Sequence, residues 1–267
     1  MTPIVIHHGL FGRGHWHVGP WHWSYFKGID RAILRRGYPV IIPTVHPTAG
    51  VITRARQLKA VILARLNEMN RRSEKVVIIA HSLGGLDARY MISHLAMADQ
   101  IKALVTISTP HRGSPIADWC VRHIGEELGA LRFMKLIRWD MQAAIDLTRD
   151  SCRIFNEETP DNPGVKYYSV SVQRPIELMP VFARHSHRLI QLEEGPNDGL
   201  VSVASAQWGQ HLGTWSADHW LAINRRLVAQ AGRSDRIIGH WMEILDRLAA
   251  DGVIEPAGEL AKGNQEK

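Results

Sequence analysis

The sequence predicts an α/β protein in which a mostly parallel central sheet is flanked by helices. Short apolar runs typical of buried parallel strands recur along the chain, and segments with helical spacing separate them. With 267 residues, 45% of them hydrophobic, the chain is long enough to bury one full core. We therefore expect a single domain over residues 1–257, followed by a polar tail at 258–267.

Six segments are expected to form strands because each is a short run rich in apolar or β-branched residues. They are IVIHH at 4–8, VII at 40–42, VVIIA at 76–80, ALVTI at 103–107, VKYYSVSV at 165–172 and RLIQL at 188–192.

Helical spacing is clearest at three places. One helix contains Phe26, Ile29 and Ile33 and is expected to end at Gly37, which suits a C-cap. Leu58, Ile62, Leu66 and Met69 line one face of a second helix, and a closing helix carries apolar residues from 237 to 248.

Nearly sixty residues between ALVTI and VKYYSVSV supply no expected strand, and their apolar residues recur at helical spacing. This pattern predicts a helical insertion over the carboxyl edge of the sheet, where ligands bind in such folds. We interpret residues 114–164 as a lid, and the pattern does not decide between static core and a lid that moves.

The net charge of +6 and the pI near 9.5 favour contact with anionic surfaces, including acidic lipid head groups, although solvated surface lysines and arginines explain them equally well. No helix-turn-helix, zinc-ligand spacing or RNA-binding aromatic motif is present, which argues against nucleic-acid binding. No bilayer-spanning run or export signal is visible, so we expect a cytoplasmic protein. Cys120 and Cys152 are then expected as reduced thiols rather than one disulfide.

The stretch VVIIAHSLGG is typical of a nucleophile elbow, in which a tight turn between a strand and a helix lifts a serine above the sheet. Ser82 is the candidate nucleophile, and Gly84 and Gly85 allow the close approach. Ala80 stands where the G-x-S-x-G pattern has glycine, a mild departure. The alternative is an ordinary glycine-rich turn in which Ser82 caps the next helix.

A serine hydroxyl needs a histidine to take its proton and a carboxylate to hold that histidine, in the chain order serine, acid, histidine. Asp198 in an N-D-G turn and His219 satisfy that order. Asp218, Glu193 and Glu194 compete for the role of acid, and an N-D-G turn can also be purely structural. The backbone N–H groups of Leu10 and Leu83 are the expected oxyanion-hole donors.

Five segments together resemble the bacterial true lipases and the related fungal triacylglycerol lipases. They are HHGLFG, AHSLGGLDARY, TISTPHRGSPIADW, EGPNDGLVSVASAQWG and DHWLAIN, in the family's order between about residues 4 and 225. The resemblance implies an α/β-hydrolase fold with the triad Ser82, Asp198 and His219, an oxyanion hole at Leu10 and Leu83, and a helical lid within 114–164. It also implies cleavage of carboxylic esters of lipids through an acyl-enzyme. The alternatives are an esterase or thioesterase acting on soluble short acyl groups, and a non-catalytic hydrolase-like binding protein.

Phe11, Trp16 and His111 are the candidate substrate-binding residues. Trp16 lies in HWHVGPWHW, whose aromatic residues could line an acyl pocket, whereas a metal site is disfavoured because no carboxylate is interleaved. His111 could instead form a loop-stabilising hydrogen bond. Asp87 and Arg89 are expected to form a structural ion pair.

No cofactor and no metal are expected. In the bacterial lipases that the chain resembles, an aspartate two positions after the catalytic histidine helps bind a structural calcium ion, and here that position is Leu221. Residues 163–197 contain no aspartate that could supply a second carboxylate ligand. The loop of His219 is therefore expected to be held by packing through Trp220 and Leu221.

Overall fold

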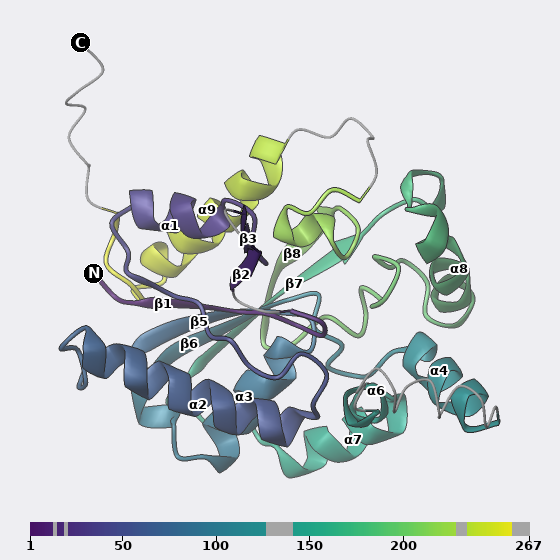
Figure 1. The fold of residues 1–267 in the computed structure, drawn as a ribbon, viewed down its shortest axis with the longest axis horizontal. Helices are drawn as coiled ribbons and strands as arrows, with labels where there is room; N and C mark the ends of the chain where they lie inside the picture. The colour runs from purple at the N-terminus through teal and green to yellow at the C-terminus, as the bar shows by residue number, and fades with distance from the viewer. Residues whose placement is uncertain (13–14, 19–20, 127–140, 228–233, 258–267) are drawn as a thin grey trace.

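A computed structural model describes residues 1–12, 15–18, 21–126, 141–227 and 234–257. A sheet of six strands, all parallel, runs through its centre in the order β4-β1-β5-β6-β7-β8 (Figure 1). Its strands are β1 (Ile4–His7), β4 (Val40–Ile41), β5 (Val76–His81), β6 (Ile101–Ile107), β7 (Lys166–Gln173) and β8 (Gln210–Ser216).

Helices cover both faces of the sheet. In Figure 1, α1 and α9 lie above it, and α2 and α3 lie below it. Their bounds are α1 (Ile29–Arg35), α9 (Ser234–Ala250), α2 (Val51–Glu68) and α3 (Gly84–His94). Because β1, β5 and most of β6 are covered on both sides, their side chains are almost entirely buried, which explains their continuous apolar sequences.

Each face of the sheet packs against its own hydrophobic core. Phe26, Ile33 and Trp241 belong to the core under α1 and α9. Leu58, Ile62 and Met91 belong to the core over α2 and α3. The expected mostly parallel sheet flanked by helices is therefore confirmed.

A group of helices lies beyond the carboxyl ends of the strands, at the right of Figure 1. It contains α4 (Pro115–Glu126), α6 (Gln142–Asp146) and α7 (Arg149–Glu158), which follow β6, and α8 (Arg184–Glu193), which follows β7. Three short 3-10 segments, Ile176–Leu178, Val181–Ala183 and Leu221–Ile223, complete this edge. Within residues 114–126 and 141–164 no strand occurs, so this part of the insertion is helical.

The expected strand RLIQL at 188–192 is wrong, because these residues form the second half of α8. Ser186, His187 and Ile190 share the buried face of that helix, whereas Leu192 is 87% exposed. A five-residue apolar run cannot distinguish strand from helix, and the helix formed because its buried residues repeat at three- and four-residue intervals. The sixth strand is β8, whose sequence QHLGTWS is half polar because it forms the edge of the sheet.

The segment HWHVGPWHW forms a small antiparallel hairpin of β2 (His15–Val18) and β3 (Trp21–Ser24). The Trp16 side chain lies outside the described part of the structure, so its assignment stays a prediction, as does that of the tail at 258–267. Cys120 and Cys152 are free thiols. Within the described residues, no helix combines the length and apolar character needed to cross a membrane.

Candidate active site

Ser82 occupies a sharp turn between β5 and α3. Its φ of 57° lies in the left-handed region that side chains rarely adopt, and its N–H donates to Ile107 O at 2.9 Å. A Cβ added to Gly85 would lie 2.2 Å from the Thr109 Oγ1, and one on Gly84 would lie 2.8 Å from His8 O. The helix can approach the sheet this closely only because both residues are glycine, as expected for a nucleophile elbow.

His219 and Asp198 form a buried pair above the same strand ends. The His219 Nδ1–H donates to Asp198 Oδ2 at 2.7 Å, and the His219 N–H donates to Asp198 O at 3.1 Å. The other carboxylate oxygen of Asp198 accepts the N–H groups of Leu200 and Val201 at 2.9 and 2.7 Å. Asp198 is fully buried, so these hydrogen bonds orient its carboxylate and compensate for its desolvation.

His81 connects this pair to the elbow. Its ring centroid is 4.6 Å from that of His219, and its Nε2–H donates to His219 O at 3.1 Å. Tyr25 donates its hydroxyl to His81 Nδ1 at 3.0 Å. Burial lowers the pKa of His81 well below its ordinary value, so the ring stays neutral and keeps this pattern. The described residues show no direct hydrogen bond between Ser82 and His219, which is common before substrate binds.

The loop after β1 lies against Ser82. A Cβ on Gly9 would lie 2.6 Å from the Ser82 Cβ, so Leu10 follows at the point of closest approach. Phe11 has a left-handed backbone, is 56% exposed, and donates its N–H to Pro47 O. By contrast, neither the Leu10 nor the Leu83 N–H donates to a backbone or side-chain acceptor in the described part of the chain. Both groups are therefore free to bind an oxyanion.

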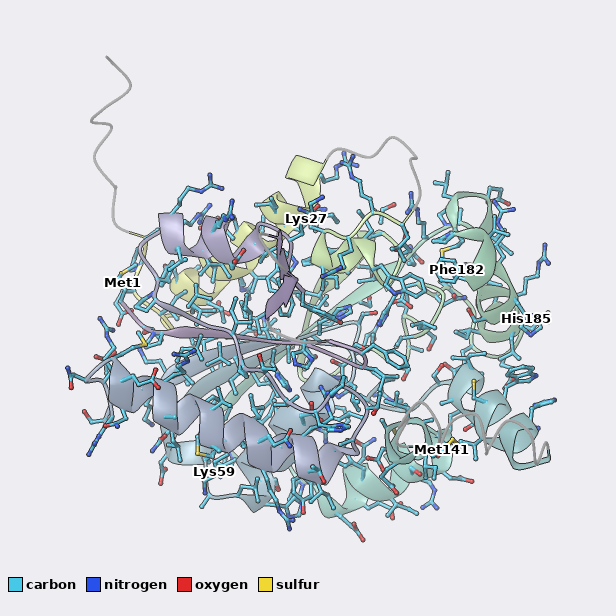
Figure 2. All side chains as sticks on the ribbon, viewed as in Figure 1. Met1, Lys27, Lys59, Met141, Phe182 and His185 are labelled. Carbon is cyan, nitrogen blue, oxygen red and sulfur yellow. The ribbon has the colours of Figure 1, made fainter. Side chains whose placement is uncertain are left out.

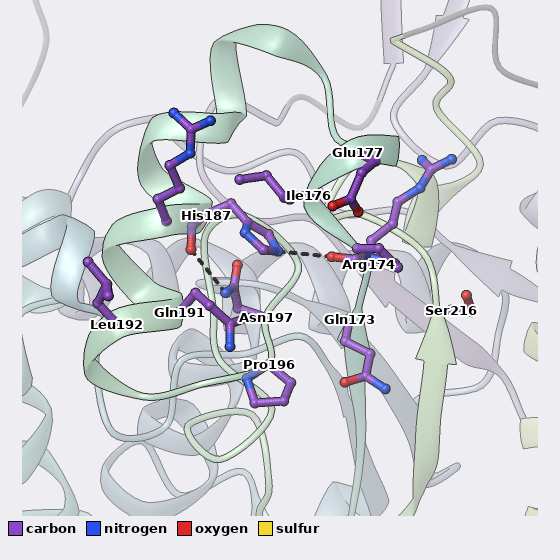
Figure 3. A pocket seen from close by; sticks show the side chains of 12 residues that line it. Gln173, Arg174, Ile176, Glu177, His187, Gln191, Leu192, Pro196, Asn197 and Ser216 are labelled. Atoms are coloured by element: carbon purple, nitrogen blue, oxygen red, sulfur yellow. Dashed lines mark hydrogen bonds between the residues drawn. The ribbon is translucent and has the colours of Figure 1, made fainter.

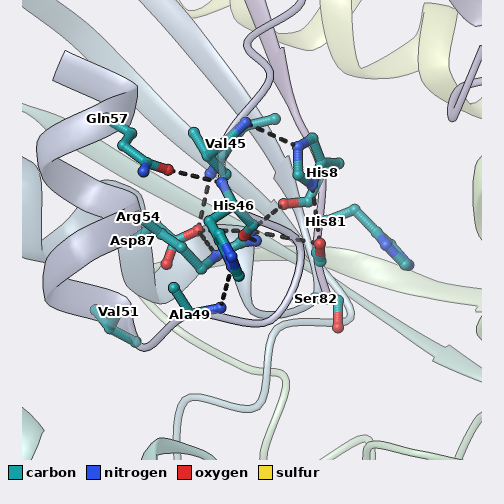
Figure 4. Close-up of polar contacts among 12 residues, drawn as sticks. His8, Val45, His46, Ala49, Val51, Arg54, Gln57, His81, Ser82 and Asp87 are labelled. Carbon is teal, nitrogen blue, oxygen red and sulfur yellow. Dashed lines mark hydrogen bonds and ion pairs between the residues drawn. The ribbon is translucent and has the colours of Figure 1, made fainter. Parts of the chain in front are cut away.

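A fully buried ion pair holds this loop to the helix that follows Ser82 (Figure 4). Arg54 on α2 donates to Asp87 on α3 at 2.9 Å, and also to His8 O at 2.8 Å. The His7 Nε2–H donates to the same Asp87 oxygen at 2.8 Å. The two loops that carry Leu10 and Leu83 are thus fixed relative to each other through one arginine.

The other acidic residues near Asp198 are engaged elsewhere. Asp218 forms an ion pair with Arg174 and accepts the N–H groups of Trp220 and Leu221. Glu193 and Glu194 both lie beside Arg149. Asp198 is the carboxylate that contacts His219.

His111 is fully buried beneath the site. Its Nε2–H donates to Thr106 Oγ1 at 3.0 Å, and its ring stacks on Trp208 at 5.2 Å between centroids. Arg89 donates to His111 Nδ1 at 3.4 Å and lies over the Trp208 ring at 3.6 Å. Both ring nitrogens of His111 already form hydrogen bonds within the protein, so we do not propose His111 as a substrate contact. The expected Asp87–Arg89 pair is wrong, because Asp87 faces Arg54.

Four residues of the site could not be given a role from sequence, although His81 and Ser108 lie within the segments AHSLGGLDARY and TISTPHRGSPIADW. Tyr25, Arg54 and His81 acquire their roles from contacts with residues far away in the chain, such as Tyr25 with His81 and Arg54 with Asp87. The fourth, Ser108, donates its hydroxyl to Asp198 Oδ2. Ser108 directly follows the predicted strand ALVTI, which is the next expected strand after the one that precedes Ser82. That position is the sequence signal that could have identified it.

A cavity of about 670 Å³ opens beside the Asp198 loop, between α8 and the ends of β7 and β8 (Figure 3). Gln173, His187, Asn197 and Ser216 contribute to its walls. None of Ser82, Asp198 and His219 lines it, so it is separate from the candidate catalytic residues.

Comparison with known proteins identifies the family. Triacylglycerol lipase 2 of Saccharomyces cerevisiae is 32% identical over 245 residues, which cover 86% of this chain and 74% of the yeast protein. The chain belongs to the triacylglycerol lipase family. It is therefore a carboxylic ester hydrolase. A triacylglycerol lipase of Pseudomonas fragi is 35% identical over 119 residues, covering 43% of this chain and 37% of that one. A PGAP1-like alpha/beta domain matches residues 51–149.

Solved structures of lipases and esterases share the fold of this family member. The Staphylococcus hyicus lipase has a TM-score of 0.74 at 16% identity and covers 95% of this chain and 97% of its own. A metagenomic carboxyl esterase has a TM-score of 0.74 at 21% identity, and the match covers 94% of this chain and 76% of the esterase. At such identities the likeness shows the α/β-hydrolase fold and does not distinguish a lipase from an esterase.

Proposed function

We propose that this chain is a lipase that hydrolyses the acyl ester bonds of triacylglycerol or a related lipid, with Ser82 as nucleophile, His219 as base and Asp198 as the orienting acid. The observation that carries the proposal is the buried His219–Asp198 pair at 2.7 Å beside a serine on a nucleophile elbow. The name of the yeast relative supports the lipid substrate.

In the proposed reaction, His219 Nε2 takes the proton of the Ser82 hydroxyl as Oγ bonds to the ester carbonyl carbon. The carbonyl oxygen becomes an oxyanion that the N–H groups of Leu10 and Leu83 stabilise. The bond to the alcohol oxygen then breaks, and His219 returns the proton to the departing alcohol. Water, deprotonated by His219, attacks the acyl-enzyme and releases the carboxylic acid and Ser82.

Exposed apolar side chains beside His219 support a lipid substrate. Val181 and Phe182 are 76% and 63% exposed, and Phe182 packs edge-on against Trp220 at 5.0 Å between centroids. Trp220 directly follows His219. Phe182 lies on the same side of the molecule as Met141 of the insertion (Figure 2). We propose that this surface and the helices within 114–164, acting as a lid of a single domain, contact lipid transiently.

The test compares p-nitrophenyl esters of increasing acyl length with emulsified triglyceride, with turnover by Ser82→Ala subtracted as background. We expect long acyl esters and the emulsion to be cleaved. Hydrolysis confined to soluble short esters would make the chain an esterase or thioesterase. Absence of Ser82-dependent hydrolysis would favour a non-catalytic binding protein.

A paired substitution tests the surface separately. Val181→Ser combined with Phe182→Ser should lower turnover of the emulsion and leave that of a soluble short ester unchanged. Leu34→Ser is the matched control, because Leu34 is 52% exposed on α1. Equal loss on both substrates would contradict a role for this surface in lipid contact.

A further inference from the structure

Ser108 occupies the position on β6 that Ser82 occupies on the neighbouring strand β5. The last residues of the two strands, Ile107 and His81, are register partners, so the two serines emerge side by side. Ser108 also has a left-handed backbone, with φ of 52°, and its N–H donates to Val170 O at 2.9 Å. A glycine would adopt this conformation more readily.

The hydroxyl of Ser108 lies in a buried cluster with Asp198 and His219. A carboxylate only accepts hydrogen bonds, so the single hydroxyl proton goes to Asp198 Oδ2. This is the oxygen that also accepts the His219 Nδ1–H at 2.7 Å, and Ser108 Oγ lies 3.4 Å from the same nitrogen. Ser108 is only 1% exposed, so water does not compete for these groups.

The two carboxylate oxygens differ in how they are held. Two backbone N–H groups fix Oδ1, whereas Oδ2 contacts the His219 ring, which must receive and return a proton in each half-reaction. The Ser108 hydroxyl is the donor that fixes Oδ2 from the rigid end of a central strand.

We propose that Ser108 is a positioning residue of the catalytic acid, which it holds in place for His219 by donating its hydroxyl to Asp198 Oδ2. The proposal rests on the proposed function, because it assigns Ser108 a role in the same triad. A purely structural serine at this site would affect stability rather than turnover.

Two substitutions separate these roles. Ser108→Ala removes the hydroxyl, and Ser108→Gly removes it while relieving the left-handed backbone. We expect both variants to lose about tenfold to hundredfold in kcat on a soluble p-nitrophenyl ester, as for a lost hydrogen bond to a charged group, with KM nearly unchanged. Ser108→Gly should unfold in urea at a midpoint no lower than that of Ser108→Ala. Ser171→Ala is the control, because Ser171 is also fully buried and bonds Thr214 and His211 away from the triad.

A double-mutant cycle tests whether Ser108 acts through Asp198. In an Asp198→Asn background, Ser108→Ala should change the residual kcat by less than about twofold, because the interacting partner is already altered. Wild-type kcat in Ser108→Gly, or an equal loss in both backgrounds, would overturn the proposal. If ester turnover survives Ser82→Ala, the proposed function itself fails; if turnover requires Ser82 but not Ser108, only the inference about Ser108 fails.

Discussion

Three residues at the carboxyl ends of neighbouring strands, Phe11, Ser82 and Ser108, have φ values between 52° and 57°. A left-handed conformation costs a non-glycine residue on the order of 1–3 kcal/mol, so the surrounding structure must hold it. Here the Ser82 and Ser108 N–H groups bond to the neighbouring strand. Three of the non-glycine residues with a left-handed backbone in the described part of the chain therefore lie at the candidate site, and Asn70, Ala96 and Asn224 adopt the same conformation elsewhere.

Asp198 and Asp218 are distinguished by their partners, which are His219 and Arg174. Asp198→Asn should lower kcat by about 10⁴, because the amide no longer holds the correct His219 tautomer. Asp218→Asn should keep kcat within about tenfold, because Asp218 bonds Arg174 and the backbone instead. Steady-state kinetics on a soluble ester, with circular dichroism to check folding, measures both. The reverse ranking would mean that Asp218 is the acid.

Ser82, Asp198 and His219 could be proposed from sequence because each lies in a short motif whose chemistry restricts the residue type. The segment RLIQL before Asp198, expected as a strand, is nevertheless part of the helix α8. Ser108, His81 and Arg54 could not be assigned, because their roles come from contacts between residues far apart in the chain. His111 was ambiguous because its surroundings cannot be read from its neighbours in sequence.

Among the secondary-structure elements, α2 and α3 meet through the buried pair of Arg54 and Asp87. Arg54→Leu leaves the Asp87 carboxylate buried without its main cation, so we expect a loss of about 3–5 kcal/mol in the free energy of unfolding. It also removes the donor to His8 O, so kcat should fall with it. Urea denaturation measures the stability change.

Arg65→Leu on the same helix is the control, because Arg65 pairs with Glu68 in solvent. Its unfolding free energy should change by less than about 0.5 kcal/mol. Similar stability of the two variants would show that the Arg54–Asp87 pair does not hold these elements together.

Contacts within the protein hold the loop of His219. Arg174 and two N–H groups already occupy the Asp218 carboxylate, Trp220 packs on Phe182, and Leu221 offers no oxygen ligand. We expect activity and Tm to be unchanged by EDTA. A calcium-dependent rise in Tm would contradict this account of the loop.

The six-stranded sheet shows which strands can be predicted from a short stretch of sequence. The expected strands at 4–8, 76–80 and 103–107 are present as β1, β5 and β6 because parallel strands buried on both faces need continuous apolar residues, and the one expected at 40–42 is present as the short edge strand β4. β8 was missed because an edge strand tolerates polar residues such as His211 and Thr214. RLIQL was assigned wrongly because five residues do not establish a helical period.

For the molecule as a whole, several histidines are buried in neutral form. Burial lowers the pKa of His7 and lowers those of His8, His81 and His111, the last three well below the ordinary value of 6.5. These rings stay neutral in the folded protein, whereas in the unfolded chain they take up protons as the pH falls below about 6.5.

Stability should therefore be fully present above that pH and fall as the solution is acidified. Between pH 7 and pH 5 each strongly shifted histidine should contribute a loss of up to about 2 kcal/mol in the free energy of unfolding. Urea denaturation at a series of pH values measures the change. Constant stability over this range would contradict the neutral burial of these histidines.

Covalent labelling tests whether Ser82 is the nucleophile. Diethyl p-nitrophenyl phosphate phosphorylates an activated serine and releases p-nitrophenol. We expect one adduct on the peptide that contains Ser82, loss of ester turnover in proportion to labelling, and no adduct in Ser82→Ala. Full turnover after complete labelling, or an adduct on another serine that accounts for the loss of activity, would contradict it.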